Sequence, residues 1–288
     1  MTDTAEILAS PAPAVADGGR PLAVVTGGTG GIGRRVVELL AGAGYRVTVL
    51  SRQGAMAGAM AGAGFADDMP VTLRACDLGR AESIAAASSA ILAQDGPVSL
   101  LVHCAGVIHP GDSAAQGADE LAAQVAVNLT GPIDLTARLL GRMQRGGHVV
   151  FVNSMAGALP LAGCGAYTAA KFGLRGYAMC LAREVRKQGI RVSSVFPAAV
   201  DTPMLRREMA EGGSVLNFVS APADPDHVAR RIVRICRHPR RETFLPAMDG
   251  LFANLCLLLP RLLDLALPVL TLAGRLGYRR FVRRGGGR

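Results

Sequence analysis

Residues Pro21 to Gly33 read P-L-A-V-V-T-G-G-T-G-G-I-G, and this stretch decides the fold of the chain. The run Pro21 to Thr26 is apolar and has the length of a buried strand. Glycines follow at once, and the next segment, Val36 to Ala43, carries apolar residues at helical spacing. A glycine turn between a strand and a helix lets the backbone approach a pyrophosphate, which the N–H groups of the helix N-terminus can bind. The alternative is a tight turn without a ligand, but the strand that follows favours phosphate binding.

The second predicted strand is Tyr45 to Leu50, and it ends at Ser51-Arg52. Dinucleotide sites that take NAD usually have an Asp or Glu at this point, which binds the ribose 2′-OH. This chain has no acidic residue there, whereas Arg52, with Arg34 as a second candidate, is suited to a 2′-phosphate. The sequence therefore predicts NADP rather than NAD. The alternative interpretation of Arg52 is a solvated surface residue.

Strands and helices alternate from residue 21 to about residue 196. Four more apolar strands are predicted at Val71 to Cys76, Val98 to His103, His148 to Val152 and Ile190 to Phe196. Helices are predicted between them at Arg80 to Gln94, at Asp119 to Arg145, and from the Tyr167 region to about Lys187. This alternation predicts an α/β fold, a doubly wound parallel sheet with right-handed crossovers. Ligands of such sheets bind at the carboxyl ends of the strands.

A tyrosine and a lysine stand four residues apart in Ala166 to Arg175, which reads A-Y-T-A-A-K-F-G-L-R. In a helix, Tyr167 and Lys171 lie on one face, about one turn apart. A lysine ammonium beside a phenol favours the phenolate and lowers the tyrosine pKa, which makes the phenol a general acid or base. Such a pair also occurs on solvated helix faces without a function. Here several candidate residues lie at strand ends, which favours an active-site pair: Gly27 to Gly33, Arg52, Asp77, Gly106 and Ser154.

The order and spacing of these motifs resemble the short-chain dehydrogenase/reductase family of the classical type, over residues 21 to about 246. T-G-G-T-G-G-I-G at 26–33 is similar to the family's T-G-x-x-x-G-x-G. Ser154 precedes Tyr167 by 13 residues, as in the family, and Tyr167 with Lys171 matches Y-x-x-x-K. Three more stretches are similar to motifs of the family. They are Asp77-Leu78, Asn128 in V-N-L-T-G, and Pro197 to Met204, which reads P-A-A-V-D-T-P-M.

The resemblance implies a role for each of these residues. Tyr167 would exchange a proton with the substrate oxygen, which Ser154 would polarise by a hydrogen bond. Lys171 would lower the tyrosine pKa and hold the nicotinamide ribose, and Asn128 would position a water that links Lys171 to solvent. Asp77 would accept from the adenine amino group. The implied cofactor contacts are Gly27, Thr29, Gly31, Ile32, Gly33, Arg52, Asp77, Leu78, Ala105, Gly106, Tyr167, Lys171, Pro197 and Thr202.

Two positions depart from the family pattern. His103-Cys104-Ala105-Gly106 replaces N-N-A-G, and the missing asparagines help to fix the fourth strand to its neighbours in the family. Ala198 replaces the glycine of the P-G pair, which is expected to narrow the space near the nicotinamide. Cys104 and Cys164 lie near this machinery in sequence. No motif pairs either of them with a base, so we interpret both as packing residues.

Composition fits one large α/β domain. The chain has 288 residues, of which 50% are hydrophobic and 18% charged, which excludes a disordered chain. Six cysteines form no C-x-x-C pair, so neither a metal site nor a disulfide framework is expected and a reducing compartment fits. Residues 1–20 are expected to be a disordered leader, not a signal peptide. The predicted division is this leader, a Rossmann-type dehydrogenase/reductase domain at 21–246 and an extension at 247–288.

The extension is apolar and then basic. From Leu251 onward the chain has seven arginines and one acidic residue, Asp264. This segment therefore carries +6 of the formal net charge of +9, and no basic face for nucleic acid is expected. Leu251 to Ala273 is long enough to span a bilayer, but prolines, Arg261 and Asp264 interrupt it. A charged residue at the centre of a membrane-spanning helix raises the free energy of insertion into the bilayer by about 2.5–3.5 kcal/mol. We therefore expect a pair of interfacial helices on a membrane surface. The alternatives are a true span, or a docking helix over the substrate cleft or a dimer face.

Together these features predict an NADP-dependent oxidoreductase that interconverts a ketone and a secondary alcohol on an apolar, lipid-like substrate. The extension, D-T-P at 201–203 and Gly165 to Gly176 also look similar to 3-ketodihydrosphingosine reductases, which favours a 3-keto lipid. The alternative is a catalytically weak cofactor-binding or scaffold protein of the same fold. We expect a cytoplasmic homo-oligomer without a nucleic-acid partner, held at the inner face of a membrane where the extension attaches it.

Overall fold

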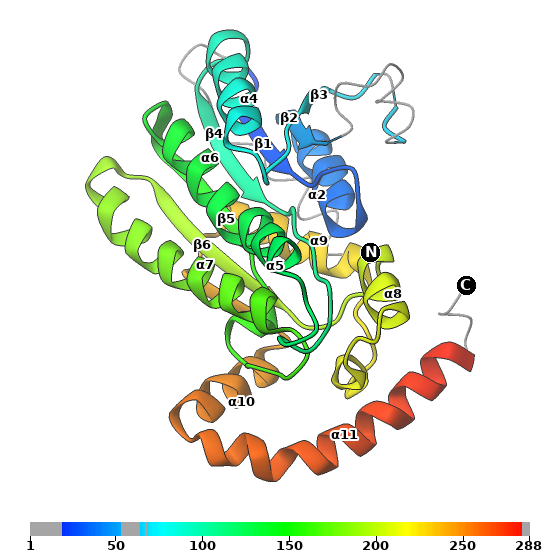
Figure 1. Ribbon diagram of the computed structural model, residues 1–288. Coiled ribbons are helices and arrows are strands. Elements are labelled where there is room, and N and C mark those ends of the chain that lie inside the picture. The colour runs from blue at the N-terminus through cyan, green and yellow to red at the C-terminus, as the bar shows by residue number, and fades with distance from the viewer. Residues whose placement is uncertain (1–18, 53–63, 67, 284–288) are drawn as a thin grey trace.

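The computed structural model describes residues 19–52, 64–66 and 68–283. The expectation for the leader up to residue 18 therefore lies outside the described residues. Figure 1 shows a central sheet with helices on both faces. At one end of this domain the extension forms a helical arm made of α10 (Ala247–Leu258) and α11 (Pro260–Arg283).

Seven parallel strands form one sheet in the order β3-β2-β1-β4-β5-β6-β7. Their bounds are β1 Leu22–Thr26, β2 Arg46–Ser51, β3 Val71–Ala75, β4 Val98–His103, β5 Met143–Val152, β6 Arg191–Pro197 and β7 Glu242–Leu245. The winding direction reverses between β1 and β4, and ligands of such sheets bind outside the strand ends at this switch point. The predicted doubly wound parallel sheet is thereby confirmed.

Helices cover both faces of the sheet. Their bounds are α2 Gly31–Gly42, α4 Ala81–Gln94, α5 Ala118–Val125, α6 Gly131–Leu140, α7 Gly165–Glu184, α8 Pro203–Ala210 and α9 Pro225–Arg237, with short turns η1 Ala126–Thr130 and η4 Val215–Phe218. α2 and α9 pack on one face, and α4, α6 and α7 on the other. β1 is buried along its whole length, because a parallel sheet is covered on both sides. This explains why its sequence is a continuous apolar run instead of an alternating one.

Three elements differ from the prediction. The helix expected at Asp119 to Arg145 is α5, the π-helical turn η1 and then α6. α6 ends at Leu140, and β5 begins at Met143 instead of His148. The sequence does not predict β7, because four residues are too few to show a strand period.

The apolar stretch of the extension folds as two helices that meet at Leu259-Pro260. Proline fits the start of a helix, since the first N–H groups have no intrahelical partner. Pro268 lies inside α11, which curves along its length (Figure 1). Within the described residues, no helix combines the length and the apolar character that crossing a bilayer requires.

The extension is fastened to the domain at two places. Arg175 of α7 donates to the Glu242 carboxylate of β7 at 2.7 and 2.9 Å and to Asn254 of α10 at 3.0 Å. Further along, the ring of Tyr278 in α11 packs against the ring of Phe218 in η4, with centroids 5.0 Å apart. The first contact links the extension to the helix that carries Tyr167 and Lys171, and the second links it to the segment after α8.

Candidate active site

The glycine turn between β1 and α2 leaves room for a ligand. Gly27 has a φ of 66°, and a Cβ there would lie 2.7 Å from the Ala105 backbone. A side chain at Gly33 would collide with the Gly27 carbonyl oxygen. Gly30 caps α2 without a side-chain hydrogen bond, and the first turn holds no acidic residue. The first N–H groups of α2 are therefore left for an anion, which fits the pyrophosphate of a dinucleotide. The other predicted residues of the turn are half-buried: Thr29, Gly31 and Ile32.

The carboxyl end of β2 carries two groups without a partner in the part of the chain that the structure describes. The Ser51 Oγ is buried and makes no hydrogen bond. The Arg52 side chain is exposed and forms neither a hydrogen bond nor an ion pair there. Arg34 is instead committed to Glu38, at 3.0 Å, and to the Gly64 carbonyl oxygen, at 2.9 Å. A buried hydroxyl and an exposed guanidinium on consecutive residues, neither with a partner among the described residues, are donors that a phosphate would satisfy.

The ends of β3 and β4 place the remaining adenosine-side residues on the same edge of the sheet. Asp77 follows β3, and its Oδ1 accepts from the Gly79 N–H at 2.9 Å, while Leu78 is buried. Ala105 follows β4 and donates its N–H to the Thr26 Oγ1 at 3.2 Å. The ends of β1 and β4 are thereby joined at the switch point.

Tyr167, Lys171 and Ser154 converge at the carboxyl end of β5, with Lys171 beside Gly106. Tyr167 and Lys171 lie on one face of α7, with the lysine Nζ 5.6 Å from the centre of the phenol ring. Ser154, which follows β5, lies close enough to Tyr167 for its hydroxyl to lower the pKa of the phenol. Lys171 is 3% exposed, and its Nζ donates to the Val152 carbonyl oxygen at 3.3 Å. A Cβ on Gly106 would lie 3.8 Å from that Nζ, so the lysine faces the end of β4.

Burial controls the protonation of both α7 side chains. It raises the pKa of Tyr167 to about 12, and the hydrogen bond with Ser154 acts in the opposite direction. It lowers the pKa of Lys171 to about 8. In the protein alone the pKa of Tyr167 is raised by desolvation of the phenol, and the lowering of this pKa by Lys171 stays a prediction. The phenol is a proton donor at neutral pH.

Asn128 is fully buried in the π-helical turn η1. Its Nδ2 donates to the carbonyl oxygens of Val107 and Gln124, at 2.7 and 2.8 Å, and its Oδ1 accepts from the Val107 N–H at 3.2 Å. A Cβ on Gly106 would lie 3.0 Å from that Oδ1, so Asn128 lies against the same glycine as Lys171. π-Helical turns often occur at functional sites. The sequence indicates Asn128 but not the turn, since no residue type marks one.

Asn153 is a site residue that the motifs do not single out. Its Nδ2 donates to the Lys171 carbonyl oxygen at 3.2 Å, and its Oδ1 accepts from the Ser154 N–H at 2.9 Å. A Cβ on Gly157 would lie 2.7 Å from the same Oδ1, so the side chain is closely surrounded. Asn153 therefore ties the backbone of one predicted catalytic residue to that of another, as a positioning residue. The signal in the sequence is a polar residue at the end of a buried strand, directly before Ser154.

His103 holds β4 where the family has an asparagine. Its ring stacks on Phe151, with centroids 4.9 Å apart, and its Nε2 lies 2.8 Å from the Thr136 Oγ1. Because the Thr136 hydroxyl donates to the Pro132 carbonyl oxygen at 2.7 Å, it accepts from the histidine Nε2–H. Burial lowers the pKa of His103 to about 3, so the ring is neutral. This histidine joins β4 to β5 and α6 in place of the missing amides.

Cys104 and Cys164 lie beside the site as protonated thiols. Burial raises the pKa of Cys104 to about 12, and it also raises the pKa of Cys164. The Cys164 Sγ lies 3.3 Å from the Thr168 Oγ1, a neutral partner that is no base. Nucleophilic chemistry requires a thiolate, so both residues fit the packing role expected of them.

The segment after β6 closes the site from another side. Pro197 ends β6, and Thr202 is the N-cap of α8. A Cβ on Gly31 would lie 3.2 Å from the Thr202 methyl group, so α8 starts against the glycine turn. The Ala198 N–H donates to the Leu245 carbonyl oxygen at 2.8 Å, which fixes this backbone to β7.

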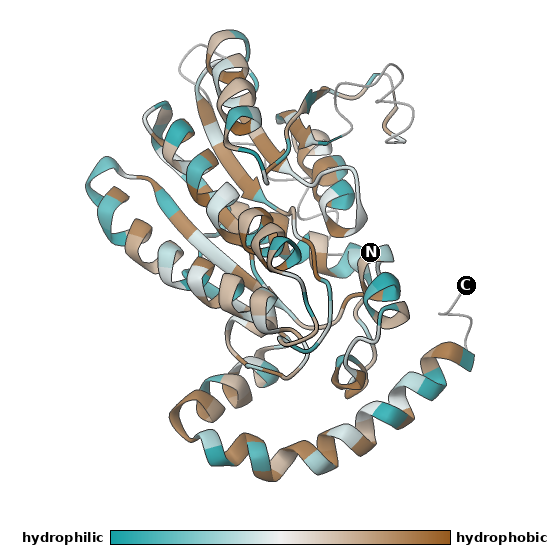
Figure 2. Cartoon of the chain, in the orientation of Figure 1, coloured by the Kyte–Doolittle hydropathy of each residue, from teal (hydrophilic) through white to brown (hydrophobic). Residues whose placement is uncertain are grey.

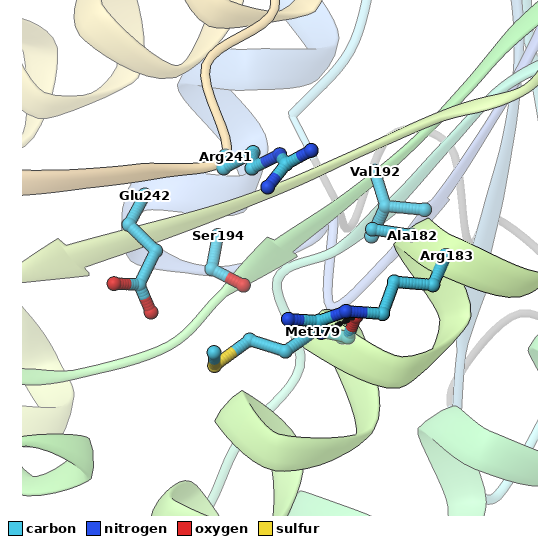
Figure 3. A pocket seen from close by; sticks show the side chains of 8 residues that line it. Met179, Ala182, Arg183, Val192, Ser194, Arg241 and Glu242 are labelled. Carbon is cyan, nitrogen blue, oxygen red and sulfur yellow. Dashed lines mark hydrogen bonds between the residues drawn. The ribbon is translucent and has the colours of Figure 1, made fainter. Parts of the chain in front are cut away.

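A separate pocket lies between α7 and the β6–β7 edge of the sheet (Figure 3). Met179 and Arg183 reach it from α7, and Arg241 reaches it from the segment before β7. None of the residues at the glycine turn or beside Tyr167 lines this pocket, so it is not part of the candidate site.

The family model of the short chain dehydrogenases matches residues 21–212. The chain belongs to this family. It is accordingly an NAD(P)-dependent oxidoreductase, and the matched residues contain the glycine turn and the Tyr167 region described above.

Relatives cover most of the chain at low identity. The human 3-oxoacyl-[acyl-carrier-protein] reductase is 34% identical over 63% of this chain and 76% of its own length. The Mycobacterium avium 3-oxoacyl-[acyl-carrier-protein] reductase is 29% identical over 87% of this chain and 93% of its own length. A solved short-chain dehydrogenase from Streptomyces avermitilis has a TM-score of 0.70 at 25% identity, covering 87% of this chain and 97% of that one.

Proposed function

We propose that this protein is an NADP-dependent oxidoreductase that interconverts a ketone and a secondary alcohol on an apolar, lipid-like substrate, with a 3-keto lipid favoured. The observation that carries the proposal is the convergence of Tyr167, Ser154 and Lys171 at the carboxyl edge of the sheet. A protonated phenol and a hydroxyl that bind the same oxygen are what a carbonyl requires as a hydride reaches its carbon.

In the reducing direction, Tyr167 donates its proton to the substrate oxygen, and Ser154 donates a hydrogen bond to that oxygen. Lys171, buried beside the phenol, stabilises the phenolate that remains. Asn153 binds the backbones of both Lys171 and Ser154 and so fixes their relative position. Asn128 binds the backbone of the loop after β4. The bound nicotinamide supplies the hydride.

The choice of NADP rests on the residues at the carboxyl end of β2. Ser51 and Arg52 present donors there, and no carboxylate follows β2 to accept from a ribose 2′-OH. A 2′-phosphate would satisfy both donors. Arg34, which the sequence offered as a second ligand, is already paired with Glu38.

Two observations support a lipid-like substrate. The human and Mycobacterium avium relatives are 3-oxoacyl-[acyl-carrier-protein] reductases. In addition, the outer face of the extension exposes leucines beside arginines, which suits the surface of an anionic membrane. Figure 2 shows apolar and polar residues alternating along α11. An enzyme held at the membrane surface would take up a lipid-like ketone directly from the bilayer, so the ketone would not have to cross water.

The substitution Tyr167→Phe tests the proposal against a scaffold that binds cofactor without turnover. It should lower kcat about 10²- to 10⁴-fold, because it removes the proton donor, while NADPH binding and the circular dichroism spectrum persist. Tyr177→Phe, on the same helix, is the matched control and should retain turnover. Equal activity of wild type and Tyr167→Phe would instead support the scaffold.

A further inference from the structure

Three side chains of α7 share one face of the helix at intervals of four residues. They are Tyr167, Lys171 and Arg175, so Arg175 follows Lys171 by about one turn. At Lys171 this face is held to β5, because the lysine Nζ donates to the Val152 carbonyl oxygen and the Asn153 amide donates to the Lys171 carbonyl oxygen. Arg175 makes further polar contacts one turn on, so it can fix the helix just beyond the predicted catalytic pair.

The guanidinium of Arg175 is bound by two partners that lie outside α7. Its Nε and one terminal nitrogen donate to the two Glu242 carboxylate oxygens at 2.7 and 2.9 Å, and the same terminal nitrogen donates to the Asn254 Oδ1 at 3.0 Å. The Arg175 and Glu242 side chains are 16% and 27% exposed, so this bidentate pair is better protected from water than a surface ion pair. Asn254 is oriented by its own helix, since its Nδ2 donates to the Gly250 carbonyl oxygen at 2.7 Å. β7 and α10 therefore both hold α7 at Arg175.

An aromatic pair beside the guanidinium extends this contact to the end of β6. The rings of Phe196 and Phe244 stack with centroids 4.5 Å apart, and the Arg175 Cζ lies 5.3 and 5.6 Å from these centroids. Cations are attracted to aromatic ring faces at such distances. Phe196 directly precedes Pro197, one of the residues expected to contact the cofactor. A Cβ on Gly250 would collide with the Phe244 ring, so α10 packs directly on this aromatic pair.

α10 also reaches the segment that carries Ser154. It contacts η2 (Met155–Gly157), the turn that directly follows this serine. The extension therefore touches both segments with predicted catalytic side chains, α7 and the segment after β5. The part of the chain that makes these contacts lies beyond residue 212, where the match to the family model ends.

We propose that Arg175 is a positioning residue that makes the geometry of Tyr167 and Lys171 depend on the docked extension. The inference rests on the proposed function, because it concerns the residues that transfer the proton. Asn254 fixes the Arg175 guanidinium from α10, and the guanidinium fixes α7 against β6 and β7. With this link intact, Lys171 stays buried beside the phenol, and Tyr167 stays directed at the substrate oxygen.

A purely structural role for Arg175 is the competing explanation, and two variants of Asn254 separate the roles. Asn254→Leu and Asn254→Asp both lose the bond from Nδ2 to the Gly250 carbonyl oxygen, but only the aspartate keeps an oxygen that accepts from Arg175. The pair of Arg175 with Glu242 remains in both variants, so both should fold. Arg183→Leu is the control on α7, because Arg183 is exposed and its guanidinium donates to a carbonyl oxygen of its own helix.

The first measurement is the pKa of Lys171, which shows whether the lysine is still buried. The sequence contains two lysines, Lys171 and the exposed Lys187, so carbon-13 labelling of lysine gives two signals in an NMR titration of the cofactor-free protein. Burial lowers the pKa of Lys171 to about 8 in wild type. In Arg175→Leu and Asn254→Leu water should reach the ammonium, so this pKa should rise by about half a pH unit or more. Asn254→Asp and Arg183→Leu should keep the wild-type value.

The second measurement is turnover of an apolar ketone with saturating NADPH at pH 7. Arg175→Leu should lower kcat about tenfold or more and leave the KM for the ketone within about twofold of wild type, because positioning acts on the transition state rather than on binding. Asn254→Leu should also lower kcat, whereas Asn254→Asp should retain it. A loss that lies in KM alone would overturn the positioning role.

An unchanged Lys171 pKa in Arg175→Leu would overturn the inference. A rise in Arg175→Leu that Asn254→Leu does not share would overturn the dependence on the extension. If Arg175→Leu does not fold, the measurement rests on Asn254→Leu, and a wild-type pKa of Lys171 there overturns the inference. A wild-type protein that reduces no ketone, but whose Lys171 pKa responds to Asn254→Leu, overturns the proposed function and leaves the positioning by Arg175 supported.

Discussion

The backbone of Gly277 in α11 packs directly on the carbonyl oxygen of Phe218 in η4, with no room for a Cβ between them. Gly274, three residues earlier, lies against the Val215 carbonyl oxygen in the same way. η4 also carries Asn217, whose amide donates to the Glu208 carboxylate of α8. The extension is thus joined through η4 to the wall of the substrate site.

Gly277→Leu should therefore separate α11 from η4. Overpacking of this kind costs about 1–3 kcal/mol, and moving α11 away is the direct way to relieve the collision. Trypsin should then cleave α11 faster at Arg275 and Arg279, and the KM for an apolar ketone should rise while the KM for NADPH stays near its wild-type value. Leu276→Ala, a neighbouring change at an exposed position, is the control. Wild-type protease resistance in Gly277→Leu would show that the contact does not hold α11.

Arg52→Asp should shift cofactor preference from NADPH towards NADH. The change removes a cation from the 2′-phosphate and supplies an acceptor for the 2′-OH. A hydrogen bond to a charged group is worth roughly 1.5–3 kcal/mol, so the ratio of kcat/KM for NADPH over NADH should fall about ten- to a hundredfold. Arg34→Gln should change the ratio little, because Arg34 is paired with Glu38. An unchanged ratio in Arg52→Asp would make Arg52 a solvated surface residue, and a loss confined to Arg34→Gln would move the phosphate site to α2.

Acid should destabilise the cofactor-free protein through its two buried histidines. Burial lowers the pKa of His103 to about 3 and that of His148 to about 4, from an ordinary value of 6.5. Since the folded pKa values lie below the unfolded one, the unfolded state binds more protons as the pH falls below 6.5. Stability is therefore full above pH 6.5 and is lost from there towards pH 4, at about 1.4 kcal/mol per pH unit for each histidine.

His103→Asn tests this account with the residue that the family has at this position. The free energy of unfolding, measured with urea at about pH 7.5, 6 and 5, should fall less steeply with falling pH in the variant than in wild type. The difference between the two slopes should equal the contribution of one histidine. His227→Asn, at an exposed position on α9, is the control. If His103→Asn and His227→Asn reduce the pH dependence of the stability equally, the burial of His103 is not the cause of that dependence.

The residues that the sequence predicts best are those whose relationships are local. Tyr167 and Lys171 share one helix, and Ser154 follows the strand just before it, so spacing along the chain is enough to bring them together. Asn153 acts on the Lys171 carbonyl, 18 residues away, and only the packing of α7 against β5 shows the contact. Glu208 looks like one charge among the exposed residues of α8, and only the packing of η4 shows that its carboxylate accepts from the Asn217 amide.

The extension illustrates the same limit. A glycine in a helix is ordinarily a weakness of about 1 kcal/mol relative to alanine, so Gly274 and Gly277 argue against a strong helix when the sequence is taken alone. In the structure their missing side chains are what allows α11 to approach η4. The apolar pattern predicts two interfacial helices, but it contains no information on which surface they dock against.

The outer face of the extension should attach the protein to anionic membranes. Leu258, Leu265, Val269 and Leu272 are 79, 81, 70 and 61% exposed, and the arginines of α11 are exposed as well. Burial of the apolar side chains would supply about 25 cal/mol per Å², and each arginine near an anionic surface about 1 kcal/mol. Full-length protein should therefore float with anionic vesicles at low salt. High salt should weaken flotation, because the arginine contacts are screened within a Debye length.

A double variant, Leu265→Glu with Leu272→Glu, tests this face more sharply than truncation, since removing the extension would also uncover Phe218. Both positions are exposed, so the contact of α11 with η4 should persist, while two carboxylates repel the anionic surface. The variant should stay in the soluble fraction at low salt and still turn over a short, water-soluble ketone. Met179→Glu, which adds the same charge at a 45% exposed position on α7, should float like wild type. Wild type that remains soluble at low salt would make membrane attachment wrong, and light scattering of wild type and the double variant would then show whether the leucine face joins two copies of the chain.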